Sequence, residues 1–176
     1  MDSTQIGLSG EFHVLAQLVQ RGLVATLTLA NTKGVDILVS DPDLDRLFRV
    51  EVKTTDRPPR RETLFSDEPN YVWAMGAKHE KLVDPRLFYC FVALQGLDQL
   101  PRFFVVPSEY VAAYVRQQHA YWLSTRVKPV AETSMRRFRI PMSDPLGFEG
   151  NWSVFADKSA PKSQCTLHES WASADG

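Results

Sequence analysis

The chain has 176 residues, of which 44% are apolar and 23% are charged, as in an ordinary globular domain. This composition excludes wholesale disorder, and the length suits one domain with a buried core. Lys and Arg total 20 and Asp and Glu total 21, which gives a formal charge of -1. That balance argues against a protein that coats nucleic acid through bulk positive charge, so any nucleic-acid contact requires local basic clusters.

The two cysteines, Cys90 and Cys165, are far apart, which predicts free thiols and neither a disulfide framework nor a thiolate metal site. The N-terminus lacks the basic stretch and apolar run of a signal peptide, and no apolar run approaches the ~20 residues that cross a bilayer. We therefore expect a cytoplasmic protein with no membrane partner. Residues 1–157 are expected to form one domain, and the Ser-, Lys-, Ala- and Pro-rich residues 158–176 a disordered tail.

The first part of the chain predicts a helix followed by two strands. Apolar residues recur at helical spacing from about residue 8 to residue 21, and Gly22 is a plausible C-terminal stop. Strict alternation of apolar and polar residues then predicts strands over 35–40 and 48–53. The turn-rich residues 41–46 join these strands, so the pair is expected to form a hairpin.

The rest of the chain is expected to complete a mixed sheet. Residues 56–70 hold three prolines and mixed charges and predict a long loop, and residues 71–83 predict a segment that is helical in its later part. The continuous apolar run 87–94 is typical of a strand buried on both faces. Further expected elements are a neighbouring strand over 102–106, a helix over 108–119 capped by Ser108, and an edge strand over 137–140. This order predicts an α/β or α+β core.

The expected hairpin places acids opposite each other. If the loop over 41–46 closes symmetrically, the apolar residues of both strands share one face, and the other face pairs Asp36 with Glu51. Lys53 lies two residues further along that face. Directly opposed carboxylates repel unless a cation lies between them, and Mg²⁺ takes such oxygen ligands together with water and substrate phosphate. The pattern favours metal-assisted phosphodiester hydrolysis, and a solvated strand face that carries charges is the alternative interpretation.

A third acid, Glu11, lies in the first turn of the expected helix. Its neighbours at helical spacing are apolar, so Glu11 lies beside the buried stripe of the helix and not squarely on the solvent face. Two interpretations stay open: an acid that joins the metal site, or an acid favoured by the helix dipole.

Three segments together resemble the PD-(D/E)XK nuclease superfamily, in its Holliday-junction-resolvase-like and restriction-endonuclease-like branches. They are Gly-Leu-Ser-Gly-Glu at 7–11, Gly-Val-Asp-Ile-Leu-Val at 34–39 and Val-Glu-Val-Lys-Thr-Thr at 50–55. The resemblance covers roughly residues 5–55 and implies a restriction-endonuclease-like αβββαβ core, with a mixed central sheet flanked by helices. It implies an Mg²⁺-dependent endonuclease acting on DNA, with Mn²⁺ as an alternative ion and RNA not excluded.

The resemblance also implies residue roles. Asp36 and Glu51 would be metal ligands, with the backbone carbonyl of Val52 as a frequent extra ligand. Lys53 would orient the attacking water or stabilise the developing charge, and Glu11 would be the helix acid of the resolvase-like branch. Since such nucleases often act as dimers, a homodimer is one arrangement the resemblance allows.

The sequence departs from the family pattern at one position. Val35 and not Pro precedes Asp36, and the literal Pro-Asp pair of the chain is Pro42-Asp43. The expected register puts Asp43 at the hairpin tip, far from Glu51. We therefore do not assign Asp43 to the site.

Positive charge is concentrated in clusters near and beyond the expected site. Arg57, Arg60 and Arg61 follow the Glu-x-Lys segment and are predicted to bind backbone phosphates, although a solvated charged loop is an equal alternative. Lys78 and His79 are further candidates for phosphate contact. Two more clusters are Arg126 with Lys128 and Arg136 with Arg137 and Arg139.

Three functions compete on these observations. The first is an Mg²⁺-dependent nuclease acting on DNA. The second is a catalytically inactive nucleic-acid-binding or assembly protein on the same fold. The third is an unrelated α/β binding protein whose strand charges form a solvated face. The combination of Asp36, Glu51 and Lys53 favours the first.

Overall fold

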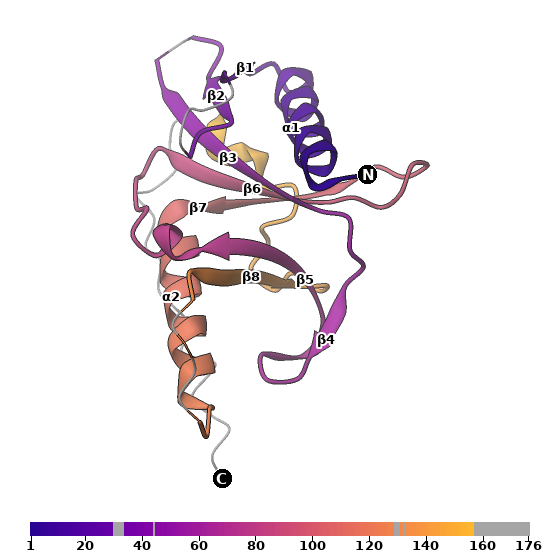
Figure 1. The fold of residues 1–176 in the computed structure, drawn as a ribbon. Helices are drawn as coiled ribbons and strands as arrows, with labels where there is room; N and C mark the ends of the chain where they lie inside the picture. The colour runs from indigo at the N-terminus through magenta and orange to yellow at the C-terminus, as the bar shows by residue number, and fades with distance from the viewer. Residues whose placement is uncertain (30–33, 44, 129–130, 132, 157–176) are drawn as a thin grey trace.

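The computed structural model describes residues 1–29, 34–43, 45–128, 131 and 133–156, so the expected tail over 158–176 and Cys165 lie outside the described residues (Figure 1). In chain order the elements are α1 (Ser3–Gln20), β1 (Val24–Leu27), β2 (Ile37–Ser40), β3 (Leu47–Thr55), β4 (Arg60–Glu62), β5 (Ser66–Gly76), the 3₁₀ helix η1 (Ala77–Glu80), β6 (Leu87–Ala93), β7 (Arg102–Pro107), α2 (Ser108–Ser124), β8 (Met135–Pro141) and the 3₁₀ helix η2 (Trp152–Phe155).

The strands form two sheets. The larger sheet has the order β1-β2-β3-β6-β7 and the smaller one the order β4-β5-β8. The larger sheet is mixed, because β3 and β6 run parallel while its other neighbours are antiparallel. The crossover from β3 to β6 contains β4, β5 and η1, and α2 follows β7. The chain therefore has a mixed α+β architecture with a mixed central sheet, as the sequence predicted.

The first helix begins earlier than its apolar pattern suggested. Asp2 and Gln5 form a capping box, in which the Gln5 N–H donates to Asp2 Oδ1 over 2.9 Å and the Asp2 N–H donates to Gln5 Oε1 over 3.0 Å. This cap starts the helix at Ser3. Gly22 follows the helix with a φ of 78°, a left-handed conformation that glycine adopts without strain.

The register of the central hairpin is confirmed over β2. Ile37 pairs with Val50 and Val39 pairs with Phe48, so the apolar residues share one face. The strand predicted to be buried on both faces is also confirmed, because every residue of β6 is buried. These strands run through the centre of the larger sheet.

Several expected elements differ in the structure. The predicted loop over 56–70 contains β4 and the start of β5, because its residues pair with each other and then with β8. The predicted helical segment at 71–83 is a strand to Gly76 followed by the short η1. Ser108 does not cap α2, since its hydroxyl donates to the Asp84 carbonyl over 2.8 Å and Pro107 occupies the N-cap position. The strand β1 was not predicted, and the predicted edge strand is present as β8.

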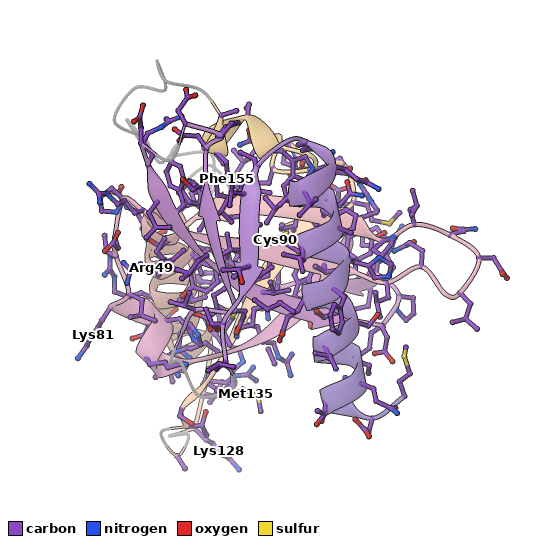
Figure 2. The ribbon with its side chains drawn as sticks, turned by 90° about the horizontal axis from the view of Figure 1, so that it is seen from above. Arg49, Lys81, Cys90, Lys128, Met135 and Phe155 are labelled. Atoms are coloured by element: carbon purple, nitrogen blue, oxygen red, sulfur yellow. The ribbon has the colours of Figure 1, made fainter. Side chains whose placement is uncertain are left out.

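Two apolar cores lie on opposite faces of the larger sheet. On one face, α1 and η2 pack against alternate residues of the central strands, with Val14 and Leu18 fully buried (Figures 1 and 2). On the other face, α2 and the smaller sheet pack against the remaining residues, with Trp73 and Phe138 at the centre. Cys90, labelled in Figure 2, is a buried free thiol whose pKa burial raises. No helix among the described residues is long and apolar enough to span a membrane.

Candidate active site

Close packing of α1 on β3 brings Glu11 to the central strands. A Cβ on Gly10 would lie 1.9 Å from Oγ1 of Thr54, so only glycine allows this approach of helix and strand. Glu11 follows Gly10 and is half-buried. Burial raises the pKa of Glu11, the negative charge of Asp36 raises it further, and Lys53 lowers it. The helix acid therefore lies within electrostatic reach of the strand residues.

Glu51 is the most enclosed acid of this region, with 2% of its side chain exposed. Its Oε1 lies 2.7 Å from Nζ of Lys53 and 3.1 Å from Nε2 of His79. Burial alone would raise the pKa of Glu51, but the hydrogen bond to His79 and the charge of Lys53 outweigh it and hold the pKa at about 2. Glu51 is thus a stable carboxylate.

The second oxygen of Glu51 is available for another partner. Oε2 is buried and has no hydrogen-bond partner among the described residues. Gly34, with a φ of +74°, lies beside it, and a Cβ there would lie 3.6 Å from Oε2. The buried hydroxyl of the neighbouring Tyr89 on β6 has no hydrogen bond of normal geometry in the described part of the chain. Burial raises the pKa of Tyr89, and the charge and hydrogen bonding of Glu51 raise it further, so this hydroxyl is a donor within reach of the Glu51 carboxylate. A buried, unpartnered carboxylate oxygen is unfavourable unless a cation or donor satisfies it.

Asp36 lies near Glu51, but a hydrogen bond to the β3 backbone and not the predicted strand pairing holds it there. The β2–β3 ladder ends at Ile37, so the predicted direct pairing of Asp36 with Glu51 is not part of it. Instead, the Val52 N–H donates to Asp36 Oδ2 over 2.6 Å. Burial raises the pKa of Asp36, and the Val52 hydrogen bond and the charge of Lys53 lower it, so that the net direction is upward. The Asp36 carboxylate therefore lies at the β3 backbone one residue beyond Glu51.

Carboxylate oxygens such as those of Asp36 and Glu51 are the ligand type that Mg²⁺ prefers. Among the described residues, no three His, Cys, Asp or Glu side chains form a group that could hold a metal. Mg²⁺ needs fewer side chains, because it binds one or two carboxylates and keeps waters or substrate phosphate. Asp36 and Glu51 would supply those carboxylates. The N–H and C=O of one strand residue point to the same edge, so the Val52 carbonyl faces the Asp36 side.

His79 lies in an environment that the sequence did not suggest. It is 3% exposed, and its Nδ1 lies 2.9 Å from the backbone N and O of Gly76. This contact directs Nε2 toward Glu51. The expected phosphate contact is therefore not compatible with its burial, and His79 holds Glu51 in place. Only the tertiary packing of η1 against β3 reveals this role.

The other predicted phosphate contacts divide into two groups. Lys78 is close enough to lower the pKa of Asp36 by its charge, so it belongs to the candidate site. Arg57 and Arg61 are exposed, at the end of β3 and on β4. Arg60 pairs with Glu62 over 2.7 Å, so part of its charge is already neutralised. The rejected Asp43 is exposed at the hairpin turn.

Comparison with known proteins identifies the fold and leaves the family open. No protein-family model matches the sequence, and no curated protein matches it. Among solved structures, the chain is similar to the bacterial homing endonuclease I-Ssp6803I, with a TM-score of 0.52 and 13% sequence identity. The match covers 87% of this chain and 90% of that protein. The likeness therefore extends over almost the whole domain and shows a nuclease-like fold.

Proposed function

We propose that the protein is a metal-dependent endonuclease of the PD-(D/E)XK type that hydrolyses phosphodiester bonds in DNA. The main support is the convergence of Asp36, Glu51 and Lys53, with a buried oxygen of Glu51 that has no partner among the described residues. The similarity of the fold to a homing endonuclease agrees with this proposal, because that protein is an endonuclease by name.

Each residue of the candidate site has a distinct role in this proposal. Asp36, Glu51 and the Val52 carbonyl would hold Mg²⁺ or Mn²⁺. When bound, such an ion activates a water and offsets negative charge on the phosphate. Lys53 places its ammonium beside Glu51, where it can bind a phosphate oxygen and stabilise the charge of the transition state. Glu11, which lies within electrostatic reach of Asp36, would accept a hydrogen bond from the attacking water and so orient it.

Substrate binding would use the basic residues around this acidic centre. Lys78 is near Asp36, and Arg57 and Arg61 are exposed beyond the end of β3, so each can contact a backbone phosphate. His79 acts as a positioning residue for Glu51. RNA is a second substrate class compatible with such contacts, since they read charge and not base sequence.

An inactive nucleic-acid-binding or assembly protein is the second candidate. One observation favours it: Lys53 and His79 already hold Oε1 of Glu51, so its charge is compensated by the chain itself. In that case the acidic cluster would stabilise the fold and bind no ion. The unpartnered Oε2 argues for the enzyme.

Cleavage of plasmid, branched and single-stranded DNA, with Mg²⁺ or Mn²⁺, tests the two candidates. We expect Glu51→Gln to reduce the cleavage rate by about a thousandfold, because it removes a charged ligand of the ion. Asp43→Asn is the matched control: it removes the exposed acid of the literal Pro-Asp pair and should cleave like the wild type.

Two results would contradict the proposed mechanism. Full activity of Glu51→Gln would exclude Glu51 as a ligand, and thermal unfolding of both variants would show whether a loss reflects unfolding. A folded wild type with no cleavage and no Mg²⁺-dependent rise in unfolding temperature would favour the inactive binding protein.

A further inference from the structure

Tyr89 carries the only hydroxyl group of β6, a strand whose residues are all buried. The tyrosine itself is 0% exposed. A buried hydroxyl is unfavourable without a hydrogen bond, and a phenylalanine would fill the same space without that penalty. The presence of the hydroxyl in an otherwise apolar strand therefore points to a partner beside it.

The acceptor next to this hydroxyl is the Glu51 carboxylate. β3 and β6 run parallel, and Glu51 lies directly opposite Tyr89 in the register. Opposite residues of neighbouring strands point to the same face, and such strands are about 5 Å apart. Oε2 of Glu51 and the Tyr89 hydroxyl are both buried and lack a hydrogen bond of normal geometry to any described residue. A donor and an acceptor that each need a partner thus lie side by side.

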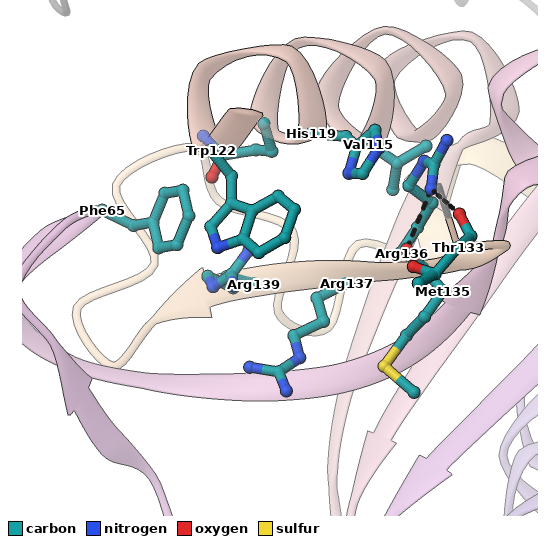
Figure 3. Close-up of a pocket in the computed structure, with 10 residues that line it drawn as sticks. Phe65, Val115, His119, Trp122, Thr133, Met135, Arg136, Arg137 and Arg139 are labelled. Atoms are coloured by element: carbon teal, nitrogen blue, oxygen red, sulfur yellow. Dashed lines mark hydrogen bonds between the residues drawn. The ribbon is translucent and has the colours of Figure 1, made fainter. Parts of the chain in front are cut away.

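The other buried polar atoms without a partner among the described residues do not form such a pair. They are Oγ1 of Thr54, Oε1 of Gln118 and Oδ1 of Asp144. Thr54 faces α1, whereas Gln118 lies on α2 beside the arginine-lined pocket between α2 and β8 (Figure 3). Asp144 lies in the turn after β8. These atoms come from three separate places in the fold.

Two ring contacts fix the direction of the Tyr89 side chain. Its ring stacks on that of Phe91, with centroids 5.8 Å apart and planes at 14°. The His79 ring meets it edge-on, with centroids 5.9 Å apart and planes at 69°. His79 in turn contacts Oε1 of Glu51. The core that positions His79 therefore also positions the Tyr89 hydroxyl.

We propose that Tyr89 is a positioning residue of the candidate site, whose hydroxyl donates a hydrogen bond to Oε2 of Glu51. The last torsion of a glutamate side chain is soft, and Lys53 and His79 hold only Oε1. A donor at Oε2 fixes the plane of the carboxylate. A carboxylate oxygen has two acceptor positions, so one stays open for an ion. The ion rests on the proposed function, whereas the contact between Tyr89 and Glu51 rests on the packing alone.

Chemical unfolding of the full chain in EDTA tests the contact without ion or substrate. Tyr89→Phe removes only the hydroxyl. If that hydroxyl donates to Glu51, its loss leaves a buried carboxylate oxygen unsatisfied, and the ratio of folded to unfolded protein should fall about tenfold. If the hydroxyl has no partner, the same change removes an unpaired buried group. An unchanged or higher ratio would therefore overturn the proposal.

A double-variant cycle assigns this loss to Glu51. In the Glu51→Gln background the acceptor is neutral, so Tyr89→Phe should lower the ratio only about threefold. Tyr71→Phe is the matched control, because Tyr71 lies in the same core and its hydroxyl accepts from Arg102 over 3.2 Å. Its effect should be equal in both backgrounds. Equal effects of Tyr89→Phe in both backgrounds would also contradict the proposal.

Two further measurements separate positioning from stability. The nitrogen NMR signal of His79 Nε2, which contacts the other oxygen of Glu51, should shift in Tyr89→Phe and stay in place in Tyr71→Phe. Calorimetric titration with Mg²⁺ alone should show about tenfold weaker binding in Tyr89→Phe and no change in Tyr71→Phe. Unchanged His79 signal and Mg²⁺ affinity in Tyr89→Phe would exclude a positioning role. A wild type that binds no Mg²⁺ would contradict the proposed function, and the unfolding cycle would still decide whether Tyr89 holds Glu51.

Discussion

The candidate active site and the arginine cluster of β4 and β8 (Arg60, Arg136, Arg137 and Arg139) both contain ion pairs. Acids are in excess at the first and arginines at the second. At the active site, the acids Glu11, Asp36 and Glu51 share mainly Lys53 as their strand cation. In the arginine cluster, four arginines share two glutamates. The first region has more acidic than basic side chains, the second has more basic than acidic ones, and each contains a buried oxygen without a hydrogen-bond partner among the described residues.

This difference shows how a chain with a formal charge of -1 can suit a polyanion. Most of its charges are compensated in pairs, so the overall sum says little about local potential. The uncompensated charge is concentrated at two places joined by η1, because His79 contacts Glu51 and Glu80 pairs with Arg136. In the proposed function, a metal ion would offset the excess of acids at the candidate active site.

Among residues that position the site and do not bind the ion, the largest effect is expected from His79, which holds Glu51 without touching substrate. His79→Ala should reduce cleavage and Mg²⁺ affinity by about 10- to 100-fold, as is typical when the partner of a metal ligand is removed. His79→Gln keeps an N–H donor and should recover part of the loss. The Mg²⁺ concentration for half-maximal cleavage checks this, because a purely structural role would not change it.

His13→Ala serves as the control, since His13 lies on α1 away from Glu51 in the sequence and outside its contacts. An unchanged Mg²⁺ requirement in His79→Ala would show that Glu51 is oriented by Lys53 alone. In that case η1 would not connect the two regions functionally.

The next largest effect is on the stability of α1, the helix that carries Glu11. Two glycines of this helix should respond in opposite ways to substitution by alanine. Gly10→Ala should destabilise the protein by about 1–3 kcal/mol, because the new methyl group overlaps Oγ1 of Thr54. Gly7→Ala should stabilise it by about 1 kcal/mol, since no described atom lies within 4 Å of the added Cβ and alanine favours a helix. Urea unfolding measures both.

The double variant Gly10→Ala/Thr54→Ala should regain part of the lost stability, because it removes the hydroxyl that the new methyl meets. Equal effects of the two glycine substitutions would mean that α1 does not require close approach to β3.

The smallest effect is a pH dependence of stability in the arginine cluster. Burial alone would raise the pKa of Glu62, but the hydrogen bond and charge of Arg139 and the charges of Arg60 and Arg137 lower it below its usual 4.5. Its stabilising contribution is therefore fully present above about pH 4.5 and is lost as the pH falls through the lower folded value. Thermal unfolding of wild type and Glu62→Gln across this range measures it.

Glu62→Gln should show a weaker decline in unfolding temperature below this pH than the wild type. Asp67→Asn, at an exposed position of the same hairpin, should decline in parallel with the wild type. Parallel curves for all three proteins would show that the ion pairs between Glu62 and the arginines do not stabilise the fold.

The sequence predicted what depends on local periodicity. Alternation placed the apolar residues of β2 and β3 on one face, and it identified Asp36, Glu51 and Lys53 as a group. Alternation could not predict β4 and β5, because their prolines and mixed charges are typical of a loop. These residues form strands because they hydrogen-bond to partner strands. Local pattern carries no information about such distant partners.

The sequence by itself determined the central hairpin, the fully buried β6 and the acidic character of the region around Glu51. Only the tertiary structure decided that Glu11 approaches Asp36 and that His79 holds Glu51, because these contacts depend on how α1 and η1 pack against β3. The tertiary structure also decided which arginines form ion pairs, since pairing depends on which carboxylates lie beside them. The physical reason is that periodicity fixes the faces of an element, whereas contacts between elements are set by long-range packing.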